Sequence, residues 1–336
     1  DMTEQNNQVI RVAQIGVGYW GPNLLRNLMV NPQLMVKAVA DLEEDRRMFV
    51  KSNYPTVTVE SDPEAIIEDP DVGAVVIATP VSTHYDLAMR CVESGKHVLV
   101  EKPMATQVSQ IEDIARVANN NNLVAMVGHT FLFNQAVRYV KDLIDRGELG
   151  DIRYIYSQRV NLGRIRNDVD AMWNLAPHDV SIIQYWLGDI EPTSIHRVGM
   201  DYVQKGINDV VFLNVIYPND VMAHIHVSWL DPHKVRKITV VGSRKMVVYD
   251  DMAENKIAIF DKGIDPLAVL GDNMDFDDPS VTQFNHRSGD VVFPRVSWKE
   301  PLKEEIAHFA SCIIHQEKCI TDTQHALRVV DILSRT

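Results

Sequence analysis

The sequence predicts two domains of different fold class. An α/β domain with a doubly wound parallel sheet is expected over residues 8–128, and an α+β domain with a large, mostly antiparallel open sheet over residues 129–336. In the first domain, apolar strand candidates alternate with helix candidates, which is the pattern of parallel βαβ units. In the second, apolar residues recur with a period of two, as in strands with one covered face. A closing helical segment, residues 301–334, is expected to pack back on the first domain.

The first strand candidate leads into a glycine-rich turn. The apolar residues 9–15 break into Gly16-Val17-Gly18-Tyr19-Trp20-Gly21, and an amphipathic segment follows. In this context the turn predicts a dinucleotide site, because Gly16 permits the tight turn and Gly18 lets the backbone approach a pyrophosphate. The helix after Gly21 directs unpaired N–H groups at the phosphates. The next strand, residues 34–40, ends at Asp41, 25 residues after Gly16, where a carboxylate can hydrogen-bond a ribose.

The rest of the first domain continues the alternation. Helices are expected over residues 42–52, 84–94 and 109–121, with a further helix start at 61–64, and strands over 56–59, 72–80, 96–100 and 123–127. Ligands of open parallel sheets bind at the carboxyl ends of the strands. We therefore expect the cofactor to contact Gly16, Gly18, Tyr19, Trp20, Gly21, Asp41, Thr79, Pro80, His84, Glu101 and Lys102.

The second domain is expected to be rich in strands. The predicted strands are residues 152–161, 194–199, 209–217, 222–229, 236–242, 245–250 and 256–260. Helices are expected over residues 134–146 and 177–187, and residues 301–334 are expected as one or two helices with a break near Thr321. Residues 261–295, rich in Gly, Pro and Asp, are interpreted as a long surface excursion.

Composition excludes several classes of function. The chain is 46% hydrophobic and 24% charged, which is ordinary for a globular protein. Its net charge of −13 argues against nucleic-acid and anionic-membrane partners, because both need a basic surface. No apolar run reaches the roughly 18 residues of a membrane span, and residues 1–7 lack a signal-peptide core. Three widely spaced cysteines without a C-x-x-C pair indicate reduced thiols, so a cytoplasmic protein is expected.

Several motifs together resemble a known family. Gly16-Val17-Gly18-Tyr19-Trp20-Gly21, Ala78-Thr79-Pro80 with His84, Glu101-Lys102-Pro103, and His178 resemble the glucose-fructose oxidoreductase / inositol dehydrogenase / MocA family of NAD(P)-dependent sugar and polyol dehydrogenases. The similarity extends over nearly the whole chain, including Ser228-Trp229-Leu230. It implies a Rossmann domain, a lysine near the reacting hydroxyl at Lys102, and an acid or base at His178. Members often have Asp four residues before that histidine, where this chain has Asn174.

The residues themselves are consistent with this chemistry. Oxidising a secondary alcohol needs a base for the hydroxyl proton and a positive group beside the developing alkoxide. Lys102 can supply the charge and His178 can take the proton near neutral pH. Asn174 could orient the imidazole or the sugar, Asp179 is a further candidate substrate contact, and His129 follows the domain crossover, where it could line the pocket. No metal site is expected, because no Cys/His cluster has zinc spacing; His224 and His226 are interpreted as polar residues of a sheet face.

The resemblance also suggests a substrate. The glycine turn and the segment Trp173-Asn174-Leu175-Ala176-Pro177-His178-Asp179 are most similar to members that oxidise C3 of nucleotide-linked N-acetylhexosamines, such as UDP-N-acetylglucosamine, for polysaccharide or lipid biosynthesis. Arg159, Arg164 and Arg166 would suit a diphosphate, or else belong to a solvated loop. The alternatives are a dehydrogenase of free sugars or inositol, and a catalytically inactive NAD-binding regulator.

Two further expectations concern cofactor preference and assembly. Asp41 would repel a 2′-phosphate, so NAD is expected to be preferred over NADP, although Arg46 and Arg47 follow closely. The antiparallel sheet is too large for its few helices to cover, so a homodimer or homotetramer formed through its open face is expected.

Overall fold

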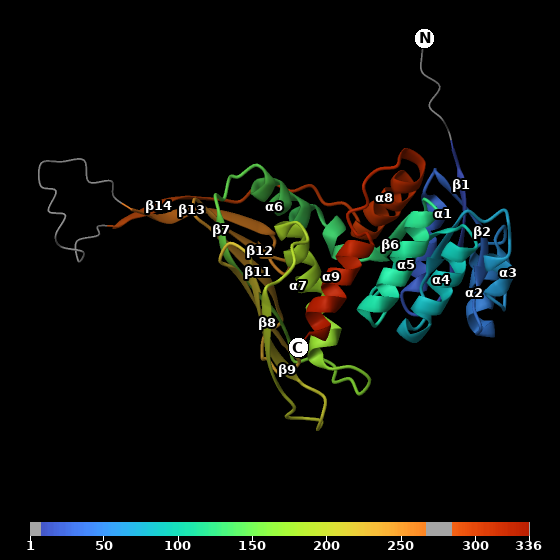
Figure 1. Ribbon diagram of the computed structural model, residues 1–336, viewed down its shortest axis with the longest axis horizontal. Coiled ribbons are helices and arrows are strands. Elements are labelled where there is room, and N and C mark those ends of the chain that lie inside the picture. Colours follow the sequence, from blue (N-terminus) through green and yellow to red (C-terminus); the bar gives the residue numbers. More distant parts are fainter. Residues whose placement is uncertain (1–7, 267–283, 336) are drawn as a thin grey trace, which may run out of the picture. The chain divides into compact units, whose positions relative to one another are not determined.

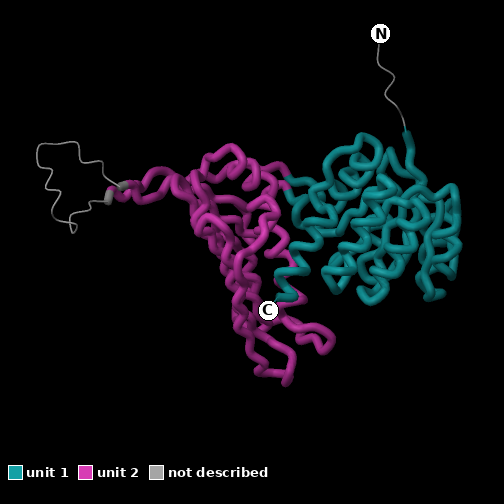
Figure 2. Tube along the Cα trace, in the orientation of Figure 1, with its two compact units in different colours: residues 1–134, 298–335 teal, residues 135–297, 336 magenta. Residues whose placement is uncertain are grey.

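The computed structural model describes residues 8–266 and 284–335, which form two compact units (Figure 2). Unit 1 comprises residues 1–134 and 298–335, and unit 2 comprises residues 135–297. The polar N-terminal residues 1–7 lie outside the described residues. Each unit has its own sheet and its own core, so each is described separately.

Unit 1 is built on a six-stranded parallel sheet (Figure 1). The strand order is β3-β2-β1-β4-β5-β6. After β3 the chain returns to the other side of β1 and adds β4, so ligands are expected beside the carboxyl ends of β1 and β4. Central strand β4 is fully buried, as its unbroken apolar sequence predicts. The strands are β1 (Ile10–Ile15), β2 (Leu34–Ala40), β3 (Thr58–Glu60), β4 (Ala74–Ile77), β5 (His97–Glu101) and β6 (Ala125–Gly128).

Helices flank the sheet of unit 1, and the two closing helices belong to it. Helix α8 contacts α1, and α9 contacts α5 and β6. Arg26 of α1 donates to both carboxylate oxygens of Glu300, at 2.6 and 3.4 Å, which ties α1 to the start of α8. The helices are α1 (Gly21–Val30), α2 (Glu44–Asn53), α3 (Glu64–Ile67), α4 (His84–Glu93), α5 (Val108–Asn120), α8 (Pro301–His315) and α9 (Thr323–Ser334), with 3-10 turns η1 (Val81–Thr83) and η2 (Thr130–Phe133).

Unit 2 contains an eight-stranded, mostly antiparallel sheet of order β14-β13-β12-β11-β7-β10-β9-β8, which confirms the predicted class. Among the described residues, β7 and β10 form its parallel pair. Helix α7 packs on β7, β9 and β10. The strands are β7 (Ile152–Val160), β8 (Ser194–Met200), β9 (Val210–Tyr217), β10 (Val221–Ser228), β11 (Val235–Gly242), β12 (Met246–Asp250), β13 (Ile257–Pro266) and β14 (Phe284–Val292), and the helices are α6 (Gln135–Asp145) and α7 (Ala171–Leu187).

The two faces of this sheet differ as the period-two pattern predicts. Ile155 of β7 and Ile225 of β10 are buried beneath α7. The alternate positions Tyr154, Tyr156 and Met222 are each close to 40% exposed, and the strand register places them together on the opposite face. Unit 2 therefore presents a partly apolar, open sheet face.

Two elements differ from the sequence prediction. Helix α7 begins at Ala171 rather than at Pro177, because Asp170 caps it by accepting a 2.9 Å hydrogen bond from the Trp173 N–H. Pro177 lies inside the helix. The interpretation of residues 261–295 as a surface excursion is wrong for residues 261–266 and 284–292, because β13 continues to Pro266 and pairs with β14. Residues 267–283 lie outside the described residues.

None of the helices described is long and apolar enough to span a bilayer.

Candidate active site

The glycine turn after β1 is shaped by close packing on one side and open space on the other. Gly16 has a φ of +93°, and a Cβ there would collide with the Ala78 carbonyl. At Gly18 nothing lies within 4 Å of an added Cβ, so the backbone is open to a ligand. Buried Gln14 holds the turn, since its Nε2 donates to the carbonyls of Gly16 and Gly21, both at 2.9 Å. Sequence reasoning missed Gln14; a lone polar side chain facing the core of an apolar strand was the signal.

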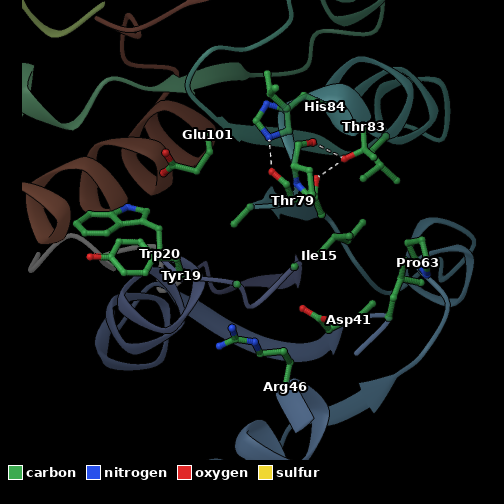
Figure 3. A pocket seen from close by; sticks show the side chains of 18 of the residues that line it. Ile15, Tyr19, Trp20, Asp41, Arg46, Pro63, Thr79, Thr83, His84 and Glu101 are labelled. Atoms are coloured by element: carbon green, nitrogen blue, oxygen red, sulfur yellow. Dashed lines mark hydrogen bonds between the residues drawn. The ribbon is translucent and has the colours of Figure 1, made fainter. Parts of the chain in front are cut away.

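A cavity of about 730 Å³ opens beside this turn, at the carboxyl ends of β1, β2, β4 and β5 (Figure 3). Its volume falls within the range of roughly 300–1,000 Å³ typical of ligand sites. The open backbone at Gly18, just before the N-terminus of α1, suits the pyrophosphate of a dinucleotide. Ten of the eleven residues predicted to bind the cofactor line the cavity: Gly16, Gly18, Tyr19, Trp20, Asp41, Thr79, Pro80, His84, Glu101 and Lys102. Gly21 is buried behind the turn.

Asp41 lies at the end of the cavity beyond β2 (Figure 3). Its carboxylate accepts hydrogen bonds from the N–H groups of Val17, at 2.7 Å, and Glu43, at 2.9 Å. The two nearby arginines are in different positions. Arg47 donates to the carbonyls of Asp41 and Leu42, at 2.9 and 2.7 Å, whereas Arg46 lines the cavity. Arg46 is therefore the arginine positioned to meet a ligand, which the sequence alone did not distinguish.

His84 joins the two loops that wall the other side of the cavity. Its Nε2 lies 2.8 Å from the carbonyl oxygen of Thr79, and its Nδ1 lies 2.8 Å from that of Pro103. A carbonyl oxygen only accepts, so both contacts are hydrogen bonds when the ring carries both protons. The pKa of His84 is lowered, because burial outweighs the opposing effect of the two carbonyls. His84 thus ties the loop after β4 to the loop that carries Lys102.

Two acidic side chains interact in unit 1: Glu101, which lines the cavity next to Lys102 in the sequence, and Glu305 of α8. Burial raises the pKa of Glu101 to about 7, and the charge of Lys102 opposes this shift. Glu305 of α8 is fully buried, and burial together with the charge of Glu101 raises its pKa well above the ordinary value. Thr130 donates to the Glu305 carboxylate at 3.2 Å. Because two like charges in a buried site cannot both form easily, this acid pair retains a proton near neutral pH. Sequence reasoning missed Glu305, which looks like an ordinary helical glutamate.

His129 is buried in unit 1, in edge-to-face contact with His325 of α9 at a ring-centroid distance of 5.4 Å. Burial, His325 and the charge of Lys102 lower the pKa of His129 well below its ordinary value. The residue is thus a neutral interior histidine close to Lys102. Its predicted contact with substrate gains no support from this position.

His178 and Asn174 lie on α7 in unit 2. Since the helix begins at Ala171, the two residues are one turn apart on the same face of α7. The Asn174 side-chain oxygen accepts a 3.1 Å hydrogen bond from the indole N–H of Trp229, which fixes the orientation of the amide. His178 is partly exposed. The structure thus holds Asn174 in place next to His178.

Comparison with protein families classifies the chain. Residues 10–129 match the model described as the oxidoreductase family with an NAD-binding Rossmann fold, and residues 137–248 match the GFO/IDH/MocA C-terminal domain. The chain belongs to the GFO/IDH/MocA family. This confirms the resemblance carried by the sequence motifs, and with it NAD as the kind of cofactor that the first unit binds.

Individual members of the GFO/IDH/MocA family show how far the similarity extends. A proposed oxidoreductase of Magnetospirillum magnetotacticum MS-1 is 28% identical with a TM-score of 0.79, covering 97% of this chain and 99% of that one. UDP-N-acetylglucosamine 3-dehydrogenase GnnA of Acidithiobacillus ferrooxidans is 21% identical with a TM-score of 0.77, covering 96% and 94%, a likeness that shows the fold. The scyllo-inositol 2-dehydrogenase (NADP(+)) IolW of Bacillus subtilis is 30% identical over 194 residues, 56% of this chain and 53% of IolW. The chain spans about half the length of the first curated relatives it matches.

The three arginines expected to bind a diphosphate do not act as a group in this GFO/IDH/MocA member. Arg159 and Asp179 are both buried and form an ion pair at 2.9 Å inside unit 2. Arg166 is paired with Asp168 at the surface, and Arg164 is exposed on the same loop. Because Arg159 and Asp179 neutralise each other in the interior, the prediction that they contact substrate gains no support. Arg164 and Arg166 are exposed and accessible to a ligand.

Proposed function

We propose that this protein is an NAD-dependent dehydrogenase that oxidises a secondary hydroxyl, at C3, of a nucleotide-linked N-acetylhexosamine such as UDP-N-acetylglucosamine. The observation that carries the proposal is the cavity that brings the open Gly18 backbone, Asp41 and Lys102 together at the carboxyl ends of the strands. The family match supports oxidoreductase chemistry, and the likeness of fold to GnnA is compatible with the substrate.

The candidate site residues have different roles in the proposed reaction. Bound NAD would supply the acceptor for the hydride that leaves the sugar carbon. The Lys102 ammonium stabilises negative charge on the reacting oxygen, and His178 takes the hydroxyl proton. Asn174, held by Trp229, orients its neighbour on α7. His84 and the acid pair of Glu101 and Glu305 position the loop that carries Lys102.

Charge and exposure indicate which residues contact the adenosine ribose of the cofactor and the diphosphate of the substrate. Asp41 accepts ribose hydroxyls and disfavours a 2′-phosphate, so NAD is preferred over NADP. Arg164 and Arg166 are accessible to a diphosphate, provided that Arg166 exchanges its surface partner Asp168 for the ligand. A biosynthetic role in polysaccharide or lipid sugars follows from such a substrate.

We also propose a homodimer or homotetramer formed through the open sheet face of unit 2. The stacked rings of Tyr154 and Tyr156, and of Phe212 and His226, give this face flat aromatic patches with centroid distances of 6.0 and 4.4 Å. Exposed apolar surface of this kind is typical of an interface between copies.

A second candidate function is the oxidation of free inositol or sugars. It is favoured by the 30% identity with IolW, a scyllo-inositol 2-dehydrogenase. The experiment that decides is NADH formation with equal concentrations of UDP-N-acetylglucosamine, scyllo-inositol, myo-inositol and N-acetylglucosamine. Activity restricted to the nucleotide sugar supports the proposal, and activity restricted to inositols supports the alternative. No turnover with any of them, together with tight NAD binding, would favour a regulatory protein.

A further inference from the structure

Three potential metal ligands meet in the interior of unit 1, away from the cofactor cavity. His308 and Cys312 lie one turn apart on α8, and Cys319 follows in the segment that connects α8 to α9. Their ligand atoms all lie within 4.8 Å of one another, and Cys312 Sγ is 3.4 Å from His308 Nε2. Such a separation matches the edge of a tetrahedral zinc site, for which Zn–S and Zn–N bonds measure about 2.3 and 2.0 Å.

The hydrogen bonds of His308 give it the form that a metal ligand requires. The backbone N–H of Ile320 donates to its Nε2 at 3.1 Å, and an N–H group can only donate. Nε2 therefore carries a lone pair on the nitrogen that lies 3.4 Å from Cys312 Sγ, and the ring proton is on Nδ1. That second nitrogen lies 3.6 Å from a Glu317 carboxylate oxygen. A carboxylate behind the far nitrogen of a histidine is the arrangement that orients zinc-bound imidazoles.

Zinc binds the thiolate form of cysteine, whereas a free thiol is mostly protonated near neutral pH. A zinc ion would displace two protons, one from each thiol, and take the Nε2 lone pair that now accepts from Ile320. Cys319 is partly exposed, which leaves a route for the ion and a fourth position for water.

We propose that His308, Cys312 and Cys319 form a zinc site that fastens the connection between α8 and α9. This connection also contacts the edge of the parallel sheet, because the carbonyl of Thr321 accepts a 2.9 Å hydrogen bond from the N–H of Val127 in β6. Zinc would therefore stabilise the edge of the sheet from which the chain leaves toward His129. The spacing of three and six residues between the ligands is not that of a C-x-x-C pair, so the sequence did not reveal it.

The test uses the full chain, stripped of metal by a chelator under reducing conditions and titrated with Zn²⁺ against a chromogenic competitor. We expect one Zn²⁺ per chain, a thiolate-to-metal band in the near ultraviolet with Co²⁺, and a higher thermal midpoint with zinc. Cys319→Ser, at a partly exposed position, should weaken zinc binding by more than about tenfold and lose the thermal shift. Cys91→Ser, which removes the buried thiol of α4, is the control for a thiol outside the cluster: it should bind zinc as wild type does and keep the thermal shift on adding zinc, although a buried serine hydroxyl lowers the midpoint itself.

Equal zinc binding by wild type and Cys319→Ser, or Co²⁺ binding without a thiolate band, would overturn the proposal. So would a mass lower by two hydrogen atoms in protein that binds no zinc, because it would show that Cys312 and Cys319 form a disulfide instead. These readouts do not involve turnover, so their outcome is independent of the proposed enzymatic activity.

Discussion

Replacing Glu101 by glutamine should change how the stability of the protein depends on pH. Burial raises the pKa of Glu101 from 4.5 to about 7, so the folded protein holds this proton more tightly than the unfolded chain. The stability from this effect is fully present below pH 4.5 and is lost as the pH rises through about 7. Each pKa unit is equivalent to about 1.36 kcal/mol, so the loss is on the order of 3 kcal/mol. Glu101→Gln does not titrate and should escape it.

The assay is urea unfolding of both proteins at a series of pH values from about 4.5 to 8.5, a range that brackets the shift. The free energy of unfolding of wild type, relative to Glu101→Gln, should fall across this range. Glu305→Gln should show the same sign, because the pKa of Glu305 is also raised. Glu300→Gln is the matched control and should leave the pH dependence over this range nearly unchanged, because the hydrogen bond from Arg26 lowers the pKa of Glu300 and its titration therefore lies below the range. Parallel curves for wild type and Glu101→Gln would show that Glu101 ionises normally, and would refute the buried acid pair.

Three further predictions follow from contacts in the two units. Asp41→Ala removes a charged hydrogen-bond acceptor worth roughly 1.5–3 kcal/mol. The ratio of kcat/KM for NAD to that for NADP should therefore fall about 10- to 100-fold. An unchanged ratio would show that other residues set the cofactor preference. Asp179→Leu removes the carboxylate that pairs with buried Arg159, and should lower the free energy of unfolding in urea titrations by about 3–5 kcal/mol. The double variant Arg159→Met with Asp179→Leu should regain most of the lost stability. Phe212→Lys, on the open sheet face, should dissociate the oligomer in analytical ultracentrifugation, and an unchanged sedimentation coefficient at micromolar concentration would place the interface elsewhere.

Local sequence patterns were sufficient to predict most of the strands and helices. The strands of unit 1 were predictable because continuous apolar runs and glycine-containing turns encode buried parallel strands over a few residues. The start of α7 was misplaced because a proline is typical of the first turn of a helix, and Pro177 was read that way. Asp170 is a suitable N-cap residue, but an aspartate alone is weaker evidence for a helix start than a proline is. Strand β14 was missed because its polar residues resemble a loop, although pairing with β13 and the ion pairs of Arg287 hold it in the sheet.

Long-range pairing explains what the sequence could not predict at the candidate site. The cofactor cavity was largely foreseeable, since many of the residues that line it lie at or just after the carboxyl ends of strands whose order the motif implies. The burial of Arg159 against Asp179 was not, because it depends on how α7 packs on β7. The approach of Glu305 to Glu101 depends likewise on the return of α8 to unit 1.

The central claim is that this chain oxidises a nucleotide sugar with Lys102 and His178 as its working residues. The most direct test is the kcat for NADH formation from UDP-N-acetylglucosamine as a function of pH, with saturating NAD, for wild type, Lys102→Ala and His178→Ala. Both variants should bind NAD as wild type does, because Gly16, Gly18 and Asp41 are unchanged. Loss of His178 should lower kcat by about 10²- to 10⁴-fold and flatten the acid limb of the profile, and loss of Lys102 should do similar damage. Wild-type turnover and an unchanged acid limb in His178→Ala would contradict the account.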